Sequence, residues 1–315
     1  MRLVGVARVT RKPGYWSTRR EQGRVDRRAR LTLVTNILVT GARGQLGGHL
    51  LRRAEATGIP ARGVGSDELD ITDADAVNAQ VEGGSVVINC AAYTAVDAAE
   101  SDEDTARAVN ELGPANLAAA CARVGARLIH VSTDYVFAGQ GDTPYEVDAP
   151  TGPATSYGRT KLAGERAVHA ALPSAHVVRT AWVYTGVGSD FVSTMLRLER
   201  ERDTVDVVDD QVGSPTFAGD LAGALLELAG RSDVDAPVLH ATNSGRASWF
   251  DLARAVFEEA GADPQRVRPC TSAQFVRPAP RPAFSVLSGR AWADVGLTPL
   301  RPWRDALHAA LHAAV

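Results

Sequence analysis

From residue 36 to about residue 180, short apolar runs alternate with longer stretches in which apolar residues recur at helical spacing. The apolar runs predict strands, and they lie at residues 37–40, 61–65, 86–89, 127–132 and 175–179. The stretches of helical spacing lie at residues 46–54, 73–81, 105–124 and 156–170. Strands that alternate with helices form βαβ units with parallel strands. The sequence therefore predicts an α/β fold around a doubly wound parallel sheet that helices cover on both faces.

After about residue 180 the pattern is less regular. Prolines and glycines interrupt it, for example at residues 213–215 and 278–282. Helices are still predicted at residues 217–229, 249–260 and 303–314. We interpret this part as a smaller lobe beyond the carboxyl ends of the strands, which is where doubly wound sheets bind ligands.

The composition of the chain argues against several classes of partner. A formal net charge of −3 gives no overall basic field that would attract nucleic acid. No stretch approaches the roughly 18 consecutive apolar residues that a spanning helix needs, so we expect no membrane partner. Three cysteines, Cys90, Cys121 and Cys270, are too widely spaced for a disulfide framework or a metal-ligand cluster. They favour a reducing, cytoplasmic compartment.

Residues 1–34 differ from the rest because they are rich in arginine and poor in apolar residues. They lack the apolar centre of a secretory signal. A basic arm for nucleic acid or lipid is one interpretation, and a true start near Val34 is another. We favour a disordered extension that contributes neither to the fold nor to activity.

The turn after the first predicted strand carries Gly41, Gly44 and Gly47 in Gly-x-x-Gly-x-x-Gly spacing. The first glycine permits a tight turn, the second lets the backbone approach a pyrophosphate, and the third lets the next helix pack closely on the sheet. The phosphates then lie at a helix N-terminus, where unpaired N–H groups favour an anion. A glycine-rich turn without a ligand is the alternative. Because this turn follows a strand and opens a helix, we favour a dinucleotide site in a Rossmann-type sheet.

The residues that follow the second predicted strand bear on which dinucleotide binds. NAD sites usually place a carboxylate there for the ribose 2′-hydroxyl. Here the strand ends at Val64-Gly65-Ser66, which offers no carboxylate unless Asp67 takes that role. Arg43 in the glycine turn is available for a bidentate contact with a 2′-phosphate, with a solvated surface residue as the alternative. We expect NADPH as the cofactor and leave NADH open as a second one.

Tyr157 and Lys161 lie four residues apart in a predicted helix and therefore share one of its faces. An ammonium beside a phenol lowers the phenol's pKa from about 10, and we expect Lys161 to do so for Tyr157. Tyr157 can then give a proton to a carbonyl oxygen as a hydride arrives. Ser132 and Thr133 end a strand 24 to 25 residues earlier, so their hydroxyls can converge on the same carbonyl. This arrangement predicts a hydride-transfer site.

Taken together, the glycine turn, a Ser/Thr strand end, Tyr157 and Lys161 resemble the extended short-chain dehydrogenase/reductases. Longer strings are similar to the dTDP-4-dehydrorhamnose reductase family within that group, and they lie at residues 89–97, 132–137, 179–184, 210–216 and 281–285. The resemblance covers the chain from about residue 36 to its end. It implies NADPH-dependent reduction of the 4-keto group of dTDP-4-dehydro-L-rhamnose to dTDP-L-rhamnose. A sugar nucleotide is accordingly the partner that we expect.

The resemblance also implies roles for individual residues. In the implied catalytic trio, Thr133 binds the keto oxygen or the Tyr157 hydroxyl, Tyr157 gives the proton, and Lys161 binds the nicotinamide ribose. The residues implied to bind the cofactor are Gly41, Arg43, Gly44, Gln45, Leu46, Gly47, Asp70, Ile71, Ala91, Ala92, Tyr93, Tyr157 and Lys161. The residues implied to bind the substrate are Thr94, Val96, Ser132, Asp134, Trp182 and Arg281.

These assignments divide the chain into an extension at residues 1–34, a NAD(P)-binding Rossmann domain at residues 35–180, and a mainly substrate-binding lobe at residues 181–315 that is interwoven with it. Two positions depart from the family pattern. Phe284 stands where the family usually has Asn, which puts the contacts there in doubt. His49 replaces a Glu that some members use in a metal-bridged dimer. We therefore expect no metal site, and a monomer or a weak homodimer.

Two other functions fit the same fold. A related sugar-nucleotide epimerase or dehydratase shares the cofactor site and the trio. A dehydratase usually needs further acid/base carboxylates, and Asp134 is the only obvious one beside the trio. The second alternative is a non-catalytic binding subunit with this fold. Such subunits tend to lose parts of the site, whereas Thr133, Tyr157, Lys161 and the three glycines are all present.

Overall fold

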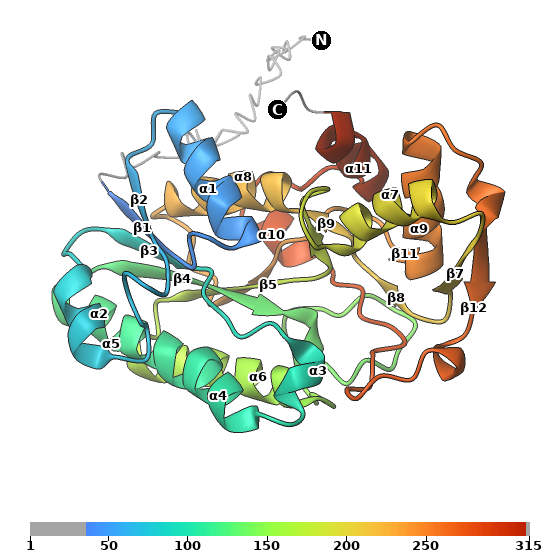
Figure 1. Ribbon diagram of the computed structural model, residues 1–315. Helices are drawn as coiled ribbons and strands as arrows, with labels where there is room; N and C mark the ends of the chain where they lie inside the picture. Colours follow the sequence, from blue (N-terminus) through green and yellow to red (C-terminus); the bar gives the residue numbers. More distant parts are fainter. Residues whose placement is uncertain (1–35, 313–315) are drawn as a thin grey trace, which may run out of the picture.

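The computed structural model describes residues 36–312, and its centre is a six-stranded parallel sheet (Figure 1). In spatial order the strands are β10 (Val238–His240), β5 (His176–Thr180), β4 (Arg127–Thr133), β3 (Val86–Asn89), β1 (Ile37–Thr40) and β2 (Ala61–Val64). The predicted α/β fold with a doubly wound parallel sheet is confirmed. From β1 the sheet continues to β2 on one side and to β3 on the other. The topological switch point therefore lies between β1 and β3, where such sheets bind ligands. The predicted extension at residues 1–34 lies outside the described residues.

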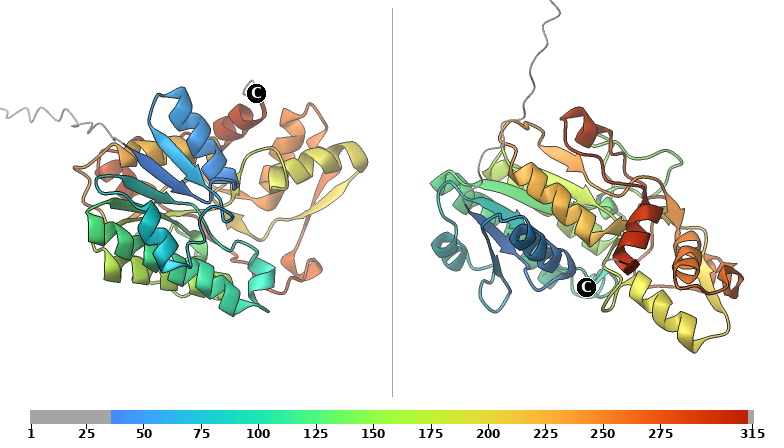
Figure 2. Two further views of the ribbon diagram at one scale, coloured as in Figure 1. Left: turned by 60° about the vertical axis from the view of Figure 1, so that its left-hand side comes forward. Right: turned by 90° about the horizontal axis from the view of Figure 1, so that it is seen from above.

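Helices cover both faces of the sheet (Figures 1 and 2). Helices α1 (Gln45–Ala56) and α8 (Ala218–Ala229) lie on one face, and the other carries α2 (Ala74–Gln80), α5 (Gly113–Val124) and α6 (Ser156–Ala171). Strands β1 and β3 are buried at every position, which explains their unbroken apolar runs. Each face has its own hydrophobic core, with Leu50 and Leu225 in the first and Leu117 and Val168 in the second.

The part of the chain after residue 180 forms a lobe built from small elements around a third core, which includes Tyr184, Phe257 and Leu307. Its helices are α7 (Phe191–Glu201), α9 (Trp249–Glu259) and α11 (Trp303–His312). Its short strands pair as β6 (Val183–Tyr184) with β9 (Thr216–Phe217), β7 (Val205–Val208) with β12 (Val267–Cys270), and β8 (Val212–Gly213) with β11 (Ala247–Ser248). Strand β10 and the helices α8 and α10 (Arg290–Asp294) come from this part of the chain but belong to the main sheet and its cover.

The helix predicted at residues 105–124 is not regular. It starts earlier as α4 (Glu103–Arg107), which follows the short helix α3 (Val96–Ala99), and a π-helical turn at Ala108–Leu112 separates it from α5. Pro114 explains the turn, because it has no N–H to donate to the carbonyl of Asn110 four residues earlier. Helix α6 approaches closely here, since a Cβ at Gly164 would lie 2.0 Å from the Asn110 carbonyl oxygen.

The other predicted elements agree with the structure to within a few residues. The helices α3, α7 and α10 and several short strands were not predicted. The last helix is described only as far as His312, so the predicted end at residue 314 is not covered. Within residues 36–312, no helix is both long and apolar enough to cross a membrane.

The packing of α1 against the glycine turn leads to a stability prediction with a built-in control. A Cβ at Gly47 would lie 2.3 Å from the backbone oxygen of Gly41, whereas a Cβ at Gly48 would meet nothing closer than 3.5 Å. Gly47→Ala should therefore destabilise the fold by about 1–3 kcal/mol. Gly48→Ala should stabilise it by up to about 1 kcal/mol through helix propensity. Denaturant unfolding of both variants measures the difference, and equal effects would contradict this account of the packing.

Candidate active site

The glycine turn brings the ends of β1 and β3 into contact. Gly41 follows β1 with a φ of +67°, and a Cβ there would lie 2.6 Å from the backbone nitrogen of Ala91, just after β3. Only glycine satisfies both requirements. Gly44 is the N-cap of α1, with no side-chain cap and no acidic residue in the first turn. The first N–H groups of α1 thus face the switch point, where they can bind an anion. Leu46 and Gly47 are buried behind them, and Gln45 is exposed.

At the end of β2, Asp67, the one carboxylate that the sequence left open for this role, lies beside Arg43. Arg43 donates from Nη2 to Asp67 Oδ2 at 2.5 Å, and Glu68 Oε2 lies 3.6 Å from the same nitrogen. Glu68 also accepts a hydrogen bond from the backbone nitrogen of Gly65 at 2.8 Å. The exception that the sequence left open, Asp67, therefore applies here, and Glu68 is a second carboxylate that was not predicted. A tight turn after Gly65 brings both carboxylates back toward Arg43. The apolar pattern of the strand carries no information about this turn.

Buried amides hold the segment after β3 that was predicted to line the dinucleotide. Asn89 accepts hydrogen bonds on Oδ1 from the Thr40 hydroxyl at 2.6 Å and from the Ala91 backbone at 3.0 Å. Asn110, in the π-helical turn, accepts from the Tyr93 nitrogen at 2.9 Å and donates to the Tyr93 oxygen at 3.1 Å. The segment with Ala91, Ala92 and Tyr93 is thus fixed at both ends while its residues stay partly exposed.

Asp70 and Ile71, which are among the residues predicted to bind the cofactor, have different surroundings. Ile71 is buried, and a Cβ at Gly113 would lie 2.4 Å from its side chain. Asp70 is exposed and accepts hydrogen bonds on Oδ1 from the backbone and the hydroxyl of Thr72, which lower its pKa. Ile71 therefore anchors this turn to α5 and leaves Asp70 at the surface.

The structure brings the predicted trio together. Thr155 caps α6 by accepting a hydrogen bond from Gly158. This cap fixes the first residue of the helix and therefore the positions of Tyr157 and Lys161 in it. Thr133 ends β4, and its hydroxyl bonds both Asp134 Oδ1, at 3.0 Å, and the Tyr157 phenol. All three trio residues are at most 9% exposed. The ring of Tyr135 packs edge-on against Tyr157, with the ring centres 5.6 Å apart.

The expectation that Lys161 lowers the pKa of Tyr157 is wrong. Burial raises the pKa of Tyr157 to about 12, more than the Thr133 hydrogen bond lowers it. The Lys161 ammonium is engaged elsewhere, since Nζ donates to the Val131 carbonyl at 2.8 Å and lies 3.5 Å from His130 Nε2. Burial also lowers the pKa of Lys161 to about 8. The lysine is therefore close to losing its proton at mildly alkaline pH.

A buried polar chain connects Lys161 to the glycine turn. Because Asn89 Oδ1 accepts from Thr40 and Ala91, its Nδ2 must be the group that donates to His130 Nδ1, at 3.0 Å. His130 is fully buried, and burial holds its pKa well below the usual value, so the ring is neutral. Its remaining N–H is then on Nε2, facing Lys161. The sequence analysis missed His130 and Asn110, whose only signal is a polar residue within an apolar strand or helix face.

The predicted substrate residues lie around the mouth of this site, with one exception. Thr94 is exposed and Val96 is half-buried on the segment after β3. Asp134 is buried, and its Oδ2 has no hydrogen-bond partner in the described part of the chain. Burial raises the pKa of Asp134 to about 6. Arg281 makes a two-point ion pair with Asp97, with both N···O distances 2.8 Å.

The exception is Ser132, whose predicted substrate contact needs correction. Its hydroxyl donates to Glu165 Oε1 at 2.5 Å, on the side of β4 that faces α6. Glu165 in turn pairs with Arg179 at 2.7 Å, and both side chains are 5% exposed. Successive residues of a strand point to opposite faces, so Ser132 points away from the face used by Thr133. Ser132 thus belongs to a buried cluster that positions β4.

Trp182 lies at the start of the C-terminal lobe in a strained backbone conformation, with a φ of +46°. Its indole stacks on Trp249, with ring centres 3.6 Å apart and planes 5° from parallel. A Cβ at Gly213 would lie 2.4 Å from the same indole. Trp249 was not among the predicted residues, because nothing local connects it to a position 67 residues earlier.

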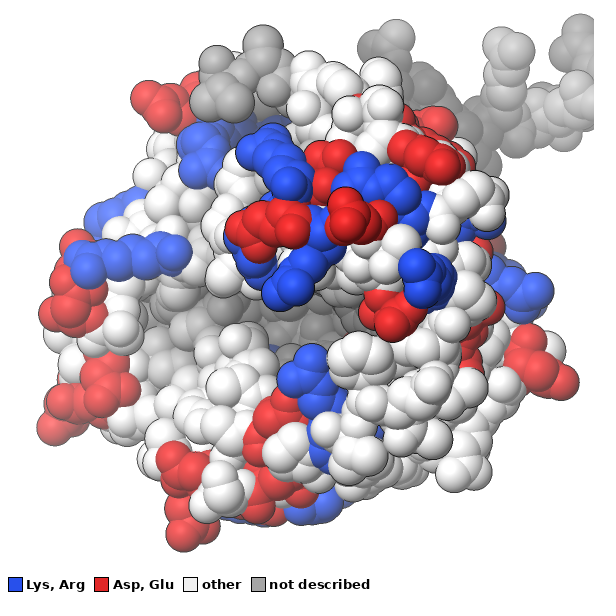
Figure 3. All heavy atoms as spheres, turned by 45° about the vertical axis from the view of Figure 1, so that its right-hand side comes forward, with Lys and Arg blue, Asp and Glu red and all other residues white. Residues whose placement is uncertain are grey.

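A cavity of about 170 Å³ opens beside the trio, lined among others by Tyr135, Thr155 and Arg281. A larger one, of about 450 Å³, lies between His240 and Trp292 and contains none of the predicted site residues. We favour the smaller cavity as part of the site because Arg281, a predicted substrate residue, lines it and because Tyr135 in its wall packs on Tyr157. Figure 3 shows that the face carrying the C-terminal lobe is hollowed near its centre and has charges of both signs along its rim.

The comparisons with known proteins agree with one another. The model of the RmlD substrate binding domain family matches residues 35–315. A dTDP-4-dehydrorhamnose reductase from Mycolicibacterium smegmatis is 58% identical over 306 residues, which cover 96% of this chain and 93% of that protein. A solved dTDP-4-dehydrorhamnose reductase from Clostridium acetobutylicum has a TM-score of 0.82 at 39% identity, covering 88% of this chain and 99% of that one. A dTDP-4-dehydrorhamnose reductase from Bacillus anthracis, solved in complex with NADP, has a TM-score of 0.84 at 33% identity, covering 89% and 99%.

The buried charge of Lys161 should reduce stability, and Lys161→Met should show by how much. The folded chain binds this proton with a pKa of about 8 instead of 10.5, so the unfolded chain holds more protons between these pH values. Stability due to this group is therefore lowest below pH 8 and rises between pH 8 and 10.5. At roughly 1.4 kcal/mol per pKa unit, the Met variant should be more stable by about 3 kcal/mol at pH 7.

Denaturant unfolding at a series of pH values checks this. Lys161 is the only lysine in residues 36–312, so no other lysine there contributes to the pH dependence. The stability difference between variant and wild type should shrink as the pH rises above 8. A difference that stays constant with pH would mean that shape, not charge, is responsible.

Proposed function

Since the chain belongs to the RmlD substrate binding domain family, we propose that it reduces the 4-keto group of dTDP-4-dehydro-L-rhamnose with NADPH, giving dTDP-L-rhamnose. The observation that carries the proposal is the buried polar chain from Thr40 through Asn89 and His130 to Lys161. It joins the anion-binding turn at the switch point to the helix that carries the proton donor. The reaction needs a hydride donor and an acid at one carbonyl. The buried polar residues fix the glycine turn and helix α6 relative to each other, and so support both.

NADPH, when bound, supplies the hydride. Tyr157 gives the proton to the keto oxygen, so that the carbonyl becomes a hydroxyl. Thr133 holds the phenol through its own hydroxyl, and that hydroxyl is held in turn by Asp134 and by the Tyr135 backbone. A phenol with a pKa of about 12 keeps its proton until negative charge develops on the oxygen beside it. Lys161 would supply positive charge toward the cofactor, with its ammonium oriented by the hydrogen bond that it donates to the Val131 carbonyl.

Three features support binding of the sugar nucleotide at the lobe side of the trio. The carboxylate of Asp134, beside Thr133, is an acceptor suited to a sugar hydroxyl. Trp182 offers an apolar face of the kind that packs on a deoxy sugar carbon. Arg281 lines the adjoining cavity and brings positive charge toward a diphosphate, while Asp97 fixes its orientation.

Cofactor choice should depend on the three charged side chains at the end of β2. We propose that Arg43 contacts the 2′-phosphate of NADPH and that Asp67 competes for the same guanidinium. The pair is exposed, at 67% and 54%, so the guanidinium can exchange the carboxylate for a phosphate at small cost. This also leaves room for some use of NADH, whose ribose hydroxyl suits a carboxylate.

The cytoplasmic location and the monomeric or weakly dimeric state remain predictions. Cys90, Cys121 and Cys270 are all free thiols, which supports a reducing compartment. Sedimentation analysis of the purified chain tests the oligomeric state.

The reaction itself is tested by mixing the purified chain with NADPH and dTDP-4-dehydro-L-rhamnose, with the UDP and GDP analogues in parallel. We expect NADPH oxidation that is fastest with the dTDP sugar, and dTDP-L-rhamnose as the product. A product that is epimerised or dehydrated without net reduction would favour the related epimerase or dehydratase. No turnover with any of these sugars would favour a binding subunit.

Tyr157→Phe should reduce turnover on the order of 10²-fold or more, because it removes the proton donor. Cofactor affinity should be nearly unchanged, since the ring and its packing on Tyr135 remain. Tyr145→Phe is the matched control, because the Tyr145 hydroxyl bonds only the Gln140 carbonyl at the surface. NADPH oxidation at saturating substrate measures turnover, and fluorescence titration measures cofactor binding. Near-normal turnover of the Tyr157 variant would rule it out as the acid.

Arg43→Ala and Asp67→Asn should shift cofactor preference in opposite directions. Loss of the guanidinium removes a charge-assisted contact to the 2′-phosphate, so the ratio of kcat/KM for NADPH over NADH should fall about 10-fold. Asp67→Asn frees Arg43 and removes a repulsive charge, so that ratio should rise. Steady-state kinetics with both cofactors measures the ratio. If Arg43→Ala weakened both cofactors equally, Arg43 would serve the shared pyrophosphate instead.

A further inference from the structure

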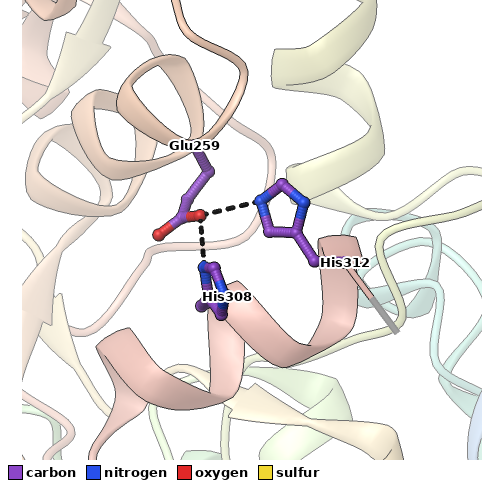
Figure 4. Close-up of side chains that lie close together, drawn as sticks. All are labelled: Glu259, His308 and His312. Carbon is purple, nitrogen blue, oxygen red and sulfur yellow. Dashed lines mark hydrogen bonds and ion pairs between the residues drawn. The ribbon is translucent and has the colours of Figure 1, made fainter. Parts of the chain in front are cut away.

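Two helices of the C-terminal lobe bring a carboxylate and two imidazoles together at the surface (Figure 4). Glu259 is the last residue of α9, and His308 and His312 lie one turn apart on α11. His308 Nδ1 lies 2.9 Å and His312 Nε2 lies 3.0 Å from the same oxygen, Glu259 Oε2. The three ligand atoms all lie within 4.8 Å of one another, and the two imidazole ring centres are 4.5 Å apart.

From this geometry we propose that Glu259, His308 and His312 bind a divalent transition metal ion of the zinc class. Two histidines at positions i and i+4 of a helix present their rings on one face, and this is a recurring way to hold zinc. A carboxylate from a second element completes a three-ligand set, with water in the fourth position. Two imidazoles with one carboxylate suit zinc, cobalt or nickel far better than magnesium, which prefers oxygen ligands.

Only small movements are needed to reach coordination geometry. Zinc lies about 2.0–2.2 Å from nitrogen and carboxylate oxygen ligands, which places the ligand atoms of a tetrahedral site about 3.3 Å apart. The two N···O distances are already shorter than that, and the rings need only to shift around the cation. The histidine side chains are 65% and 47% exposed, so they can rotate, while Glu259 is 21% exposed and better fixed.

The ion would join α9 to α11 and thereby stabilise the lobe. Both helices contribute to the third hydrophobic core, through Phe257 and Leu307. Helix α11 also supports the segment after β6, since a Cβ at Gly186 would lie 3.1 Å from Leu311. None of the three ligands takes part in the hydride-transfer site, so the proposal stands apart from the proposed reaction.

The test uses the full chain without a histidine tag, first treated with EDTA, and titrates it with zinc chloride. We expect binding of one ion by calorimetry and an increase in Tm of roughly 5 °C at saturation, since a ligand that binds only the folded state stabilises it. Magnesium chloride at the same concentration should give no increase. The double variant His308→Ala/His312→Ala should lose the binding, and Glu259→Gln should weaken it by at least about 10-fold.

Two further measurements make the result specific. His169→Ala removes a histidine that contacts only the Pro237 carbonyl, so it should keep full zinc binding. In EDTA, the double variant should match wild type in turnover, because its side chains lie outside the active site. Failure of wild type to bind zinc would overturn the proposal. So would a double variant that binds it with unchanged affinity, because the ion would then be held elsewhere.

Discussion

The contact between the ends of β1 and β3 determines where everything else in the active site lies. Gly41 and Ala91 meet at a distance that leaves no room for a Cβ, and Gly47 lets α1 start directly behind them. The N–H groups of α1 therefore converge on the switch point without a side-chain cap. Any residue that widened this contact would move the anion site away from the trio. The glycine spacing is thus a geometric requirement set by backbone atoms.

The same contact begins a buried polar chain that is expensive to maintain. An uncharged imidazole and a lysine with a depressed pKa occupy the space between β4 and α6, where apolar side chains would be more stable. Helix α6 is held against this chain by the close approach of Gly164 to Asn110. The arrangement gives up stability so that Lys161 and Tyr157 keep one orientation, which is the usual compromise at a preorganised site.

Much of the fold could be predicted because its central strands are buried on both faces. A strand buried on both faces has an unbroken run of apolar residues, which is visible in the sequence. The glycine turn, Thr133, Tyr157 and Lys161 could be predicted because each depends on local spacing. Partners that come from distant elements could not. Ser132 was assigned to the substrate because its partner Glu165 lies 33 residues away in the sequence. Arg43 was assigned to a phosphate because the turn that brings Asp67 to it has no periodic pattern. The direction of the pKa shift of Tyr157 was predicted wrongly, because the spacing of Tyr157 and Lys161 shows that they share a helix face but does not show how deeply Tyr157 is buried.

The C-terminal lobe shows the same limit more strongly. Its strands are two to four residues long, so they carry almost no periodic signal, and they are held by pairings between distant positions. Trp182 adopts a left-handed backbone conformation because its indole packs between Trp249 and the backbone of Gly213. Both of these residues lie far from Trp182 in the sequence. Strain of this kind persists only where surrounding contacts over-determine the conformation.

The lobe's rigidity therefore depends on how firmly α9, which begins with Trp249, is held by its neighbours. Helix α11 is one such neighbour, and the residues that join the two helices lie at the opposite end of α9, at Glu259. The stacked tryptophan pair and this surface cluster therefore lie at opposite ends of the same helix.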